Sequence, residues 1–82
     1  MKRVRRINPE LLGKAPLVEI TGENRVLIEN HLGVVCYCPE EIQIKVCYGI
    51  ISVAGQGLQF MQLNRDQLVV NGRIDNVSLL RR

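Results

Sequence analysis

The chain has 82 residues, a length that allows one domain. Its hydrophobic share of 46% and its mean hydropathy of +0.05 are typical of a globular protein and exclude an intrinsically disordered one. No apolar run approaches the ~20 residues that span a bilayer, and polar residues interrupt any signal peptide after the basic start, so we expect a cytosolic protein.

Six basic side chains lie at the two ends of a chain whose net charge is +3. The residues between them hold the other five basic groups and all eight acidic groups, so the body of the chain is mildly acidic. Basic ends can contact an anionic membrane surface or a nucleic acid, and they can also be solvated tails. The residues concerned are Lys2, Arg3, Arg5, Arg6, Arg81 and Arg82.

The first part of the chain is expected to form a basic arm, followed by a single β domain. The arm is residues 1–13, in which residues 9–12 suit one helical turn with Pro9 at its start. The domain is residues 14–82, and turn-forming residues divide its first part into strands. Those strands are expected over 17–20, 25–30 and 34–38.

From Ile42 onward, apolar residues alternate with polar ones, the period of two that places every second side chain on one face of a strand. Glycine or polar residues interrupt the alternation at short intervals, which predicts short strands joined by turns. Tyr48-Gly49 and Asn71-Gly72 are the strongest hairpin candidates, since Asn-Gly supplies the positive φ of a tight turn. The strands are expected over 42–47, 50–54, 58–63, 68–70 and 73–80.

These elements predict an all-β domain of seven or eight short, mostly antiparallel strands, arranged as a sandwich or a roll. Very short strands with glycine corners also suit a short β-solenoid, which is the alternative. A chain of this length buries a modest core as a monomer. The sequence therefore favours a homo-oligomer, in which self-association adds core and covers the edges of the sheet.

Few side chains of this sequence suit catalysis or metal binding. The three cysteines, Cys36, Cys38 and Cys47, are expected to be reduced thiols, because their number is odd and no secretion signal is evident. With His31 they lack the Cys-x-x-Cys spacing of a zinc site, and no third group orients His31 as the base of a cysteine nucleophile. Residues 55–57, Gly-Gln-Gly, are too short for a phosphate loop. We therefore predict no enzyme activity, no metal and no cofactor.

The run Leu27-Ile28-Glu29-Asn30-His31, followed by Gly33, stands at the centre of a longer motif over residues 22–35. This motif resembles the signature of the YabP/YqfC sporulation family, and its Ile-Glu-Asn-His portion points to the YqfC branch. The similarity continues downstream, so that it covers roughly residues 16–79. The three cysteines are not part of it. The similar downstream segments are 41–45, 48–53 and 68–74.

Members of that family are small proteins of endospore-forming bacteria, so the resemblance implies a role in building the spore. It implies a place in the cytoplasm of the mother cell, near the forespore membrane, and no enzymatic activity. It also implies a membrane-protein partner that is made from a neighbouring gene.

The resemblance and the β domain together predict a non-enzymatic sporulation protein with a structural or scaffolding role. It would act through self-association or through a membrane-protein partner. A small nucleic-acid-binding β module that uses the basic termini is the alternative function. The candidate interaction surface is Arg25, Glu29, Asn30 and His31, and the competing interpretation is that these residues satisfy the backbone of a turn. The six basic end residues are the candidate contacts to an anionic surface.

Overall fold

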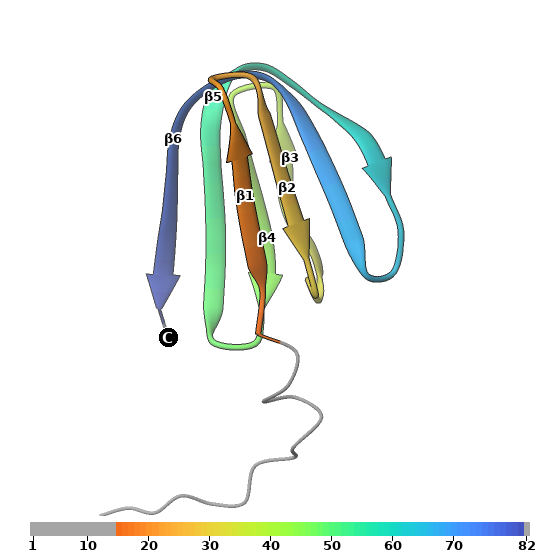
Figure 1. Cartoon of the computed structure of the whole chain (residues 1–82). Helices are drawn as coiled ribbons and strands as arrows, with labels where there is room; N and C mark the ends of the chain where they lie inside the picture. The colour runs from red at the N-terminus through yellow and green to blue at the C-terminus, as the bar shows by residue number, and fades with distance from the viewer. Residues whose placement is uncertain (1–14, 82) are drawn as a thin grey trace, which may run out of the picture.

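Two long, bent strands organise the fold (Figure 1). The computed structural model describes residues 15–81, and in this part of the chain six strands form one antiparallel sheet in the order β1-β2-β6-β5-β4-β3. The predicted arm and its helical turn lie outside the described residues. The strands are β1 (Leu17–Thr21), β2 (Arg25–Glu29), β3 (Gly33–Cys38), β4 (Glu41–Val46), β5 (Gly49–Leu63) and β6 (Gln67–Arg81).

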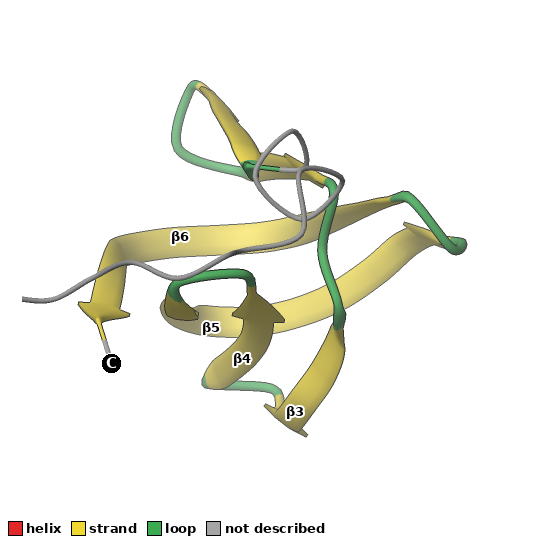
Figure 2. Ribbon diagram, turned by 90° about the horizontal axis from the view of Figure 1, so that it is seen from below, coloured by secondary structure: helices red, strands yellow, loops and turns green. Residues whose placement is uncertain are grey.

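The sheet folds over on itself because β5 and β6 bend part-way along their length (Figures 1 and 2). The first layer contains β1, β2, residues 67–71 of β6 and residues 59–63 of β5. The second layer contains β3, β4, residues 49–54 of β5 and residues 76–81 of β6. The two layers share their long strands, which makes the molecule a rolled sheet.

The core lies between the two layers, and the alternation of the sequence decides which side chains enter it. In the first layer Val26 and Ile28 of β2 are fully buried beside Leu68 and Val70 of β6. Full burial of each such side chain contributes about 1.5–3 kcal/mol to stability. The second layer adds Ile42, Ile44, Val46, Ile51 and Val53.

The bends of the long strands are held by hydrogen bonds that their backbone N–H groups donate to neighbouring turns. In the bend of β5, the N–H of Gly55 donates to the carbonyl oxygen of Glu40 at 3.0 Å. The N–H of Leu58 donates to the carbonyl oxygen of Pro39 at 2.9 Å. The bend of β6 donates in the same way to the carbonyls of residues 23–24, at 2.8 and 3.2 Å. Each hairpin turn therefore braces one bend.

The all-β class is confirmed, but the predicted number of strands is wrong. The expected breaks at residues 55–57 and at Asn71-Gly72 lie inside β5 and β6, so the described residues form six strands instead of seven or eight. Asn71-Gly72 is therefore not a hairpin. Glycine allows the chain to bend at these points, while the pairing of β5 with β6 continues on both sides of the bend.

Two further expectations concern the connections. The predicted hairpin at Tyr48-Gly49 is confirmed, since Val46 pairs with Gly49 across a turn. The β-solenoid is excluded, because every strand pair among the described residues is antiparallel and solenoid strands stack in parallel. No helix in residues 15–81 is long and apolar enough to cross a membrane.

Candidate interaction surface

Asn30, in the connection between β2 and β3, ties separate parts of the fold together. Its φ of 64° lies in the left-handed region, which asparagine tolerates better than most residues. Its backbone N–H donates to the carbonyl oxygen of Asp66 at 2.6 Å, and its Nδ2 donates to the carbonyl oxygen of Ala15 at 3.1 Å. Asn30 thereby joins β2 to the β5–β6 turn and to the residues that lead into β1.

His31 is 9% exposed, and both of its ring nitrogens are hydrogen-bonded to backbone. The N–H of Gly33 donates to Nδ1 at 3.0 Å, so Nδ1 is an acceptor. Nε2 then carries the ring proton and donates it to the carbonyl oxygen of Asn64 at 2.8 Å. Because both nitrogens are engaged, the geometry supports a framework role for His31 rather than that of a general base.

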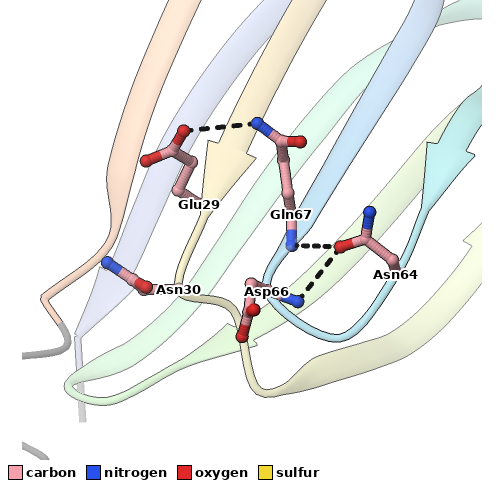
Figure 3. Close-up of a pocket in the computed structure, with 5 residues that line it drawn as sticks. All are labelled: Glu29, Asn30, Asn64, Asp66 and Gln67. Atoms are coloured by element: carbon pink, nitrogen blue, oxygen red, sulfur yellow. Dashed lines mark hydrogen bonds between the residues drawn. The ribbon is translucent and has the colours of Figure 1, made fainter.

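A polar hollow of about 360 Å³ lies beside this connection and is lined by two of the four predicted interaction residues, Glu29 and Asn30 (Figure 3). Nε2 of Gln67 donates to Oε2 of Glu29 at 3.2 Å. Oδ1 of Asn64 accepts the backbone N–H groups of Asp66 and Gln67 at 3.2 and 3.0 Å. These bonds connect the β5–β6 turn to the end of β2. The hollow is lined by Glu29, Asn30, Asn64, Asp66 and Gln67.

The remaining predicted residues are separated from this hollow. Arg25 is exposed at the opposite end of β2 from Glu29, so the structure does not bring the four candidate interaction residues together. Cys36 and Cys38 lie on β3, and Cys47 lies in the β4–β5 turn. Across residues 15–81, no three side chains of the metal-binding types come together. A contact between a partner and Arg25, Glu29 or Asn30 stays a prediction.

Glu41, on β4, has a polar environment that changes its ionisation. Its Oε2 accepts hydrogen bonds from Nε2 of Gln43 at 3.0 Å and from Oγ of Ser52 at 2.8 Å. These two bonds, Gln43 first, stabilise the carboxylate and lower the pKa of Glu41 below its ordinary value.

Ser52→Ala is expected to raise the pKa of Glu41 towards its ordinary value, which NMR titration of the carboxyl group would measure. The pKa of Glu41 is lower in the folded protein than in the unfolded protein. The hydrogen bond from Ser52 therefore stabilises the folded protein at pH values above the unfolded-state pKa, and this contribution is lost as the pH falls through the folded-state pKa. The stability difference between wild type and variant should therefore shrink on acidification. Ser78→Ala, at the cross-strand neighbour of Ser52, is the control. An unchanged Glu41 pKa in Ser52→Ala would contradict this account.

One side of the roll is closed by an aromatic pair. Tyr37 of β3 packs against Phe60 of β5, with ring centroids 5.2 Å apart. The hydroxyl of Tyr37 also donates to the carbonyl oxygen of Leu58 at 3.3 Å. On this side, β3 of the second layer is therefore joined to the β5 segment of the first layer.

The opposite side of the roll, between β1 and residues 76–81 of β6, is open. Val18 and Ile20 pair with the buried Ile28 and Val26, so they point towards the core, yet they remain 36% and 52% exposed. Leu79 pairs with the buried Ile51 and is 38% exposed. A hollow of about 220 Å³ lies here. We call Val18, Ile20, Tyr48, Val77 and Leu79 the open side.

The open side also has unpaired backbone. Among the described strands, β1 is at one end of the sheet and pairs with β2 alone. Residues 76–81 of β6 pair with β5, whereas β2 pairs with residues 67–71 of β6. Within residues 15–81, two strand edges without a paired strand therefore border a partly exposed apolar hollow, the arrangement to which a further strand can add.

Comparisons with known proteins support the family resemblance that was seen in the motif at the end of β2. A family model described as the YabP family matches residues 14–82. The chain belongs to the YabP family. This family is associated with sporulation. "Uncharacterized protein YqfC" of Bacillus subtilis (strain 168) is 22% identical over 77 residues, which cover 94% of this chain and 83% of YqfC. No solved structure matches the chain.

The structure gives the motif of this YabP-family protein a physical meaning. Glu29, Asn30 and His31 all bond to residues of the β5–β6 region or to the start of β1. Val18 and Leu79 were not predicted from the sequence to be surface residues. Their alternation looks like that of any half-buried strand, and nothing local shows that their strands lie at open edges.

Proposed function

We propose that this protein is a non-enzymatic structural component of spore formation that joins to copies of itself or to a membrane-protein partner through the open side. Its place would be the mother-cell cytoplasm near the forespore membrane, as the family resemblance implies. The observation that carries the proposal is the open side itself, where side chains that point towards the core stay exposed beside two unpaired strand edges.

Covering the open side is favourable for two physical reasons. Val18, Ile20 and Leu79 each still expose a third to a half of their surface. Removing that surface from water would contribute roughly 1 kcal/mol for each side chain. An added strand would also pair with the free backbone groups of β1 or β6, which supplies both hydrogen bonds and register.

Leu79→Lys should weaken association about tenfold or more, because a charge then lies where an apolar partner surface would pack. Sedimentation of the purified protein over a wide range of concentration would measure this. Leu63→Lys is the matched control, since Leu63 is also exposed but lies at the end of β5, away from the open side. Circular dichroism would show that both variants remain folded.

The second arm of the experiment tests the membrane-protein partner that the family resemblance implies, by co-expression of this chain with a membrane protein from a neighbouring gene. Co-purification that Leu79→Lys abolishes and Leu63→Lys preserves would support the proposal. A strictly monomeric protein at high concentration that also fails to bind this partner would overturn it. Equal effects of the two lysine variants would show that the open side is not the contact.

A further inference from the structure

One end of the second layer combines basic and aromatic side chains. A hollow of about 460 Å³ lies there, beside the β4–β5 turn. The guanidinium carbon of Arg81 lies 5.4 Å from the centre of the Tyr48 ring, a cation–π contact that keeps the charge and the ring together. We call the residues that line this hollow the Tyr48 end. They are Lys45, Cys47, Tyr48, Gly49 and Arg81.

The Tyr48 end adjoins an apolar surface and has no carboxylate among its described lining residues. Tyr48 lines both this hollow and the apolar hollow of the open side. The acidic Glu29 and Asp66 line a third hollow, which shares no lining residue with the Tyr48 end. In Figure 2, the β5–β6 turn and the end of β6 lie on opposite sides of the molecule.

The first described strand begins, and the last described strand ends, in this part of the molecule. β1 begins and β6 ends at the end of the roll that carries the β4–β5 turn (Figure 1). In the sequence, Arg82 follows Arg81, and residues 1–14 precede the two residues that lead into β1. That preceding sequence holds Lys2, Arg3, Arg5, Arg6 and Lys14, and its single acidic residue is Glu10.

We infer that the Tyr48 end binds an anionic membrane surface. Tyrosine is favoured at the level of the lipid headgroups, where its ring is partly buried and its hydroxyl stays hydrated. Lys45 and Arg81 are placed to face anionic headgroups, and the adjoining Leu80, which is exposed, would meet the outer part of the acyl region. This surface adjoins the open side, with which it shares Tyr48, and it would orient the protein on a bilayer.

The composition of this end favours a lipid surface over a nucleic acid. Single-stranded nucleic acids are held by several aromatic side chains that stack on successive bases. At the Tyr48 end, the described lining residues include one aromatic ring, and Arg81 stands over one of its two faces. The apolar hollow next to the basic groups matches the boundary between headgroups and acyl chains instead.

The test uses the full chain and sedimentation with vesicles. We expect binding to vesicles of phosphatidylglycerol and phosphatidylcholine in equal parts, little binding to phosphatidylcholine alone, and weaker binding as salt is added. Lys45→Glu should lower the affinity roughly tenfold or more, because it replaces an attraction by a repulsion. Arg25→Glu makes the same charge change at the other end of the roll, and we expect an effect several-fold smaller.

A spectroscopic measurement shows whether Tyr48 itself meets the bilayer. The chain has no tryptophan, so Tyr48→Trp would place a single tryptophan, which can be excited selectively over tyrosine, at the Tyr48 end. Its emission should shift to the blue on addition of the anionic vesicles, because the ring moves into a less polar environment. Removal of residues 1–6 should weaken the binding and leave the shift present at saturating lipid.

Several results would overturn the inference. They are equal binding to neutral and anionic vesicles, equal effects of Lys45→Glu and Arg25→Glu, and a tryptophan emission that does not change while the protein is bound. Loss of all binding on removal of residues 1–6, together with an ineffective Lys45→Glu, would show that the arm alone contacts lipid and would also overturn it. Retention on a nucleic acid without vesicle binding would assign this end to the nucleic-acid alternative.

Discussion

Gly55→Ala is expected to lower the free energy of unfolding by about 3 kcal/mol or more, a large part of the stability of so small a domain. A β-carbon at this position would stand 1.8 Å from the carbonyl oxygen of Arg73. That oxygen belongs to the backbone of β6 and cannot rotate away as a flexible side chain would. The two long strands would have to separate at the bend, which would strain the hydrogen bond from Gly55 to Glu40. Thermal and denaturant unfolding would measure the loss.

Gly57→Ala is the matched control for this prediction. Gly57 lies in the same bend with a φ of 62°, but no atom stands within 4 Å of the place of its β-carbon. Alanine at this position is expected to lower the free energy of unfolding by about 1–2 kcal/mol, because of strain in the left-handed backbone, without causing a clash. If Gly55→Ala proved no more destabilising than Gly57→Ala, the close approach of β5 and β6 at the bend would not contribute as we describe.

His31→Ala is expected to destabilise the protein by about 2–3 kcal/mol. The change removes the acceptor of the Gly33 N–H and the donor to the Asn64 carbonyl, and it leaves a space where the buried ring was. The partly buried N–H of Gly33 then loses its partner, which costs more than the net value of the bond. Equilibrium unfolding in urea would measure the difference, and hydrogen exchange at Gly33 should become faster.

Leu32→Ala provides the comparison for His31. Leu32 is the next residue in the same connection and is exposed, so its truncation should change stability by less than about 0.5 kcal/mol. A His31→Ala variant that is as stable as Leu32→Ala but fails to associate would contradict the framework role. It would instead support the prediction that His31 belongs to an interaction surface.

The two proposed surfaces adjoin each other and would make different kinds of contact. The open side uses the edges of β1 and β6, which suits pairing with another polypeptide strand. The Tyr48 end uses a turn and a strand terminus, which suits contact with a flat charged surface. Because Tyr48 borders both hollows, a protein held at a bilayer by this end would present its open side close to the membrane.

The alternation of the sequence predicted most of the strands and which of their side chains share a face. Val26 and Ile28, and likewise Ile42 and Ile44, lie in the core as the period of two requires. The same reasoning failed at residues 55–57 and at Asn71-Gly72. A glycine signals that the chain changes direction, but the local sequence does not show whether the partner strand changes direction with it.

The contacts of the candidate site residues were even harder to predict from the local sequence. The sequence identified Asn30 and His31 as unusual polar residues in a turn, and the structure shows that their partners lie far along the chain, at Asn64 and Asp66. Val18 alternates in the same way as Val26, yet Val26 is buried and Val18 is partly exposed. The difference comes from the position of β1 at one end of the sheet, which is not a property of its own residues.

By itself, the sequence determined that this chain forms short β-strands, which face of most strands is buried, and that it resembles the YabP/YqfC family. These properties depend on local alternation and on a contiguous motif. The tertiary structure alone decided that β5 and β6 run unbroken through two layers, that Tyr37 closes one side of the roll, and that the other side stays open. The physical reason is that strand pairing is made by backbone groups, which are alike in nearly every residue. Which edges remain free therefore depends on the whole sheet.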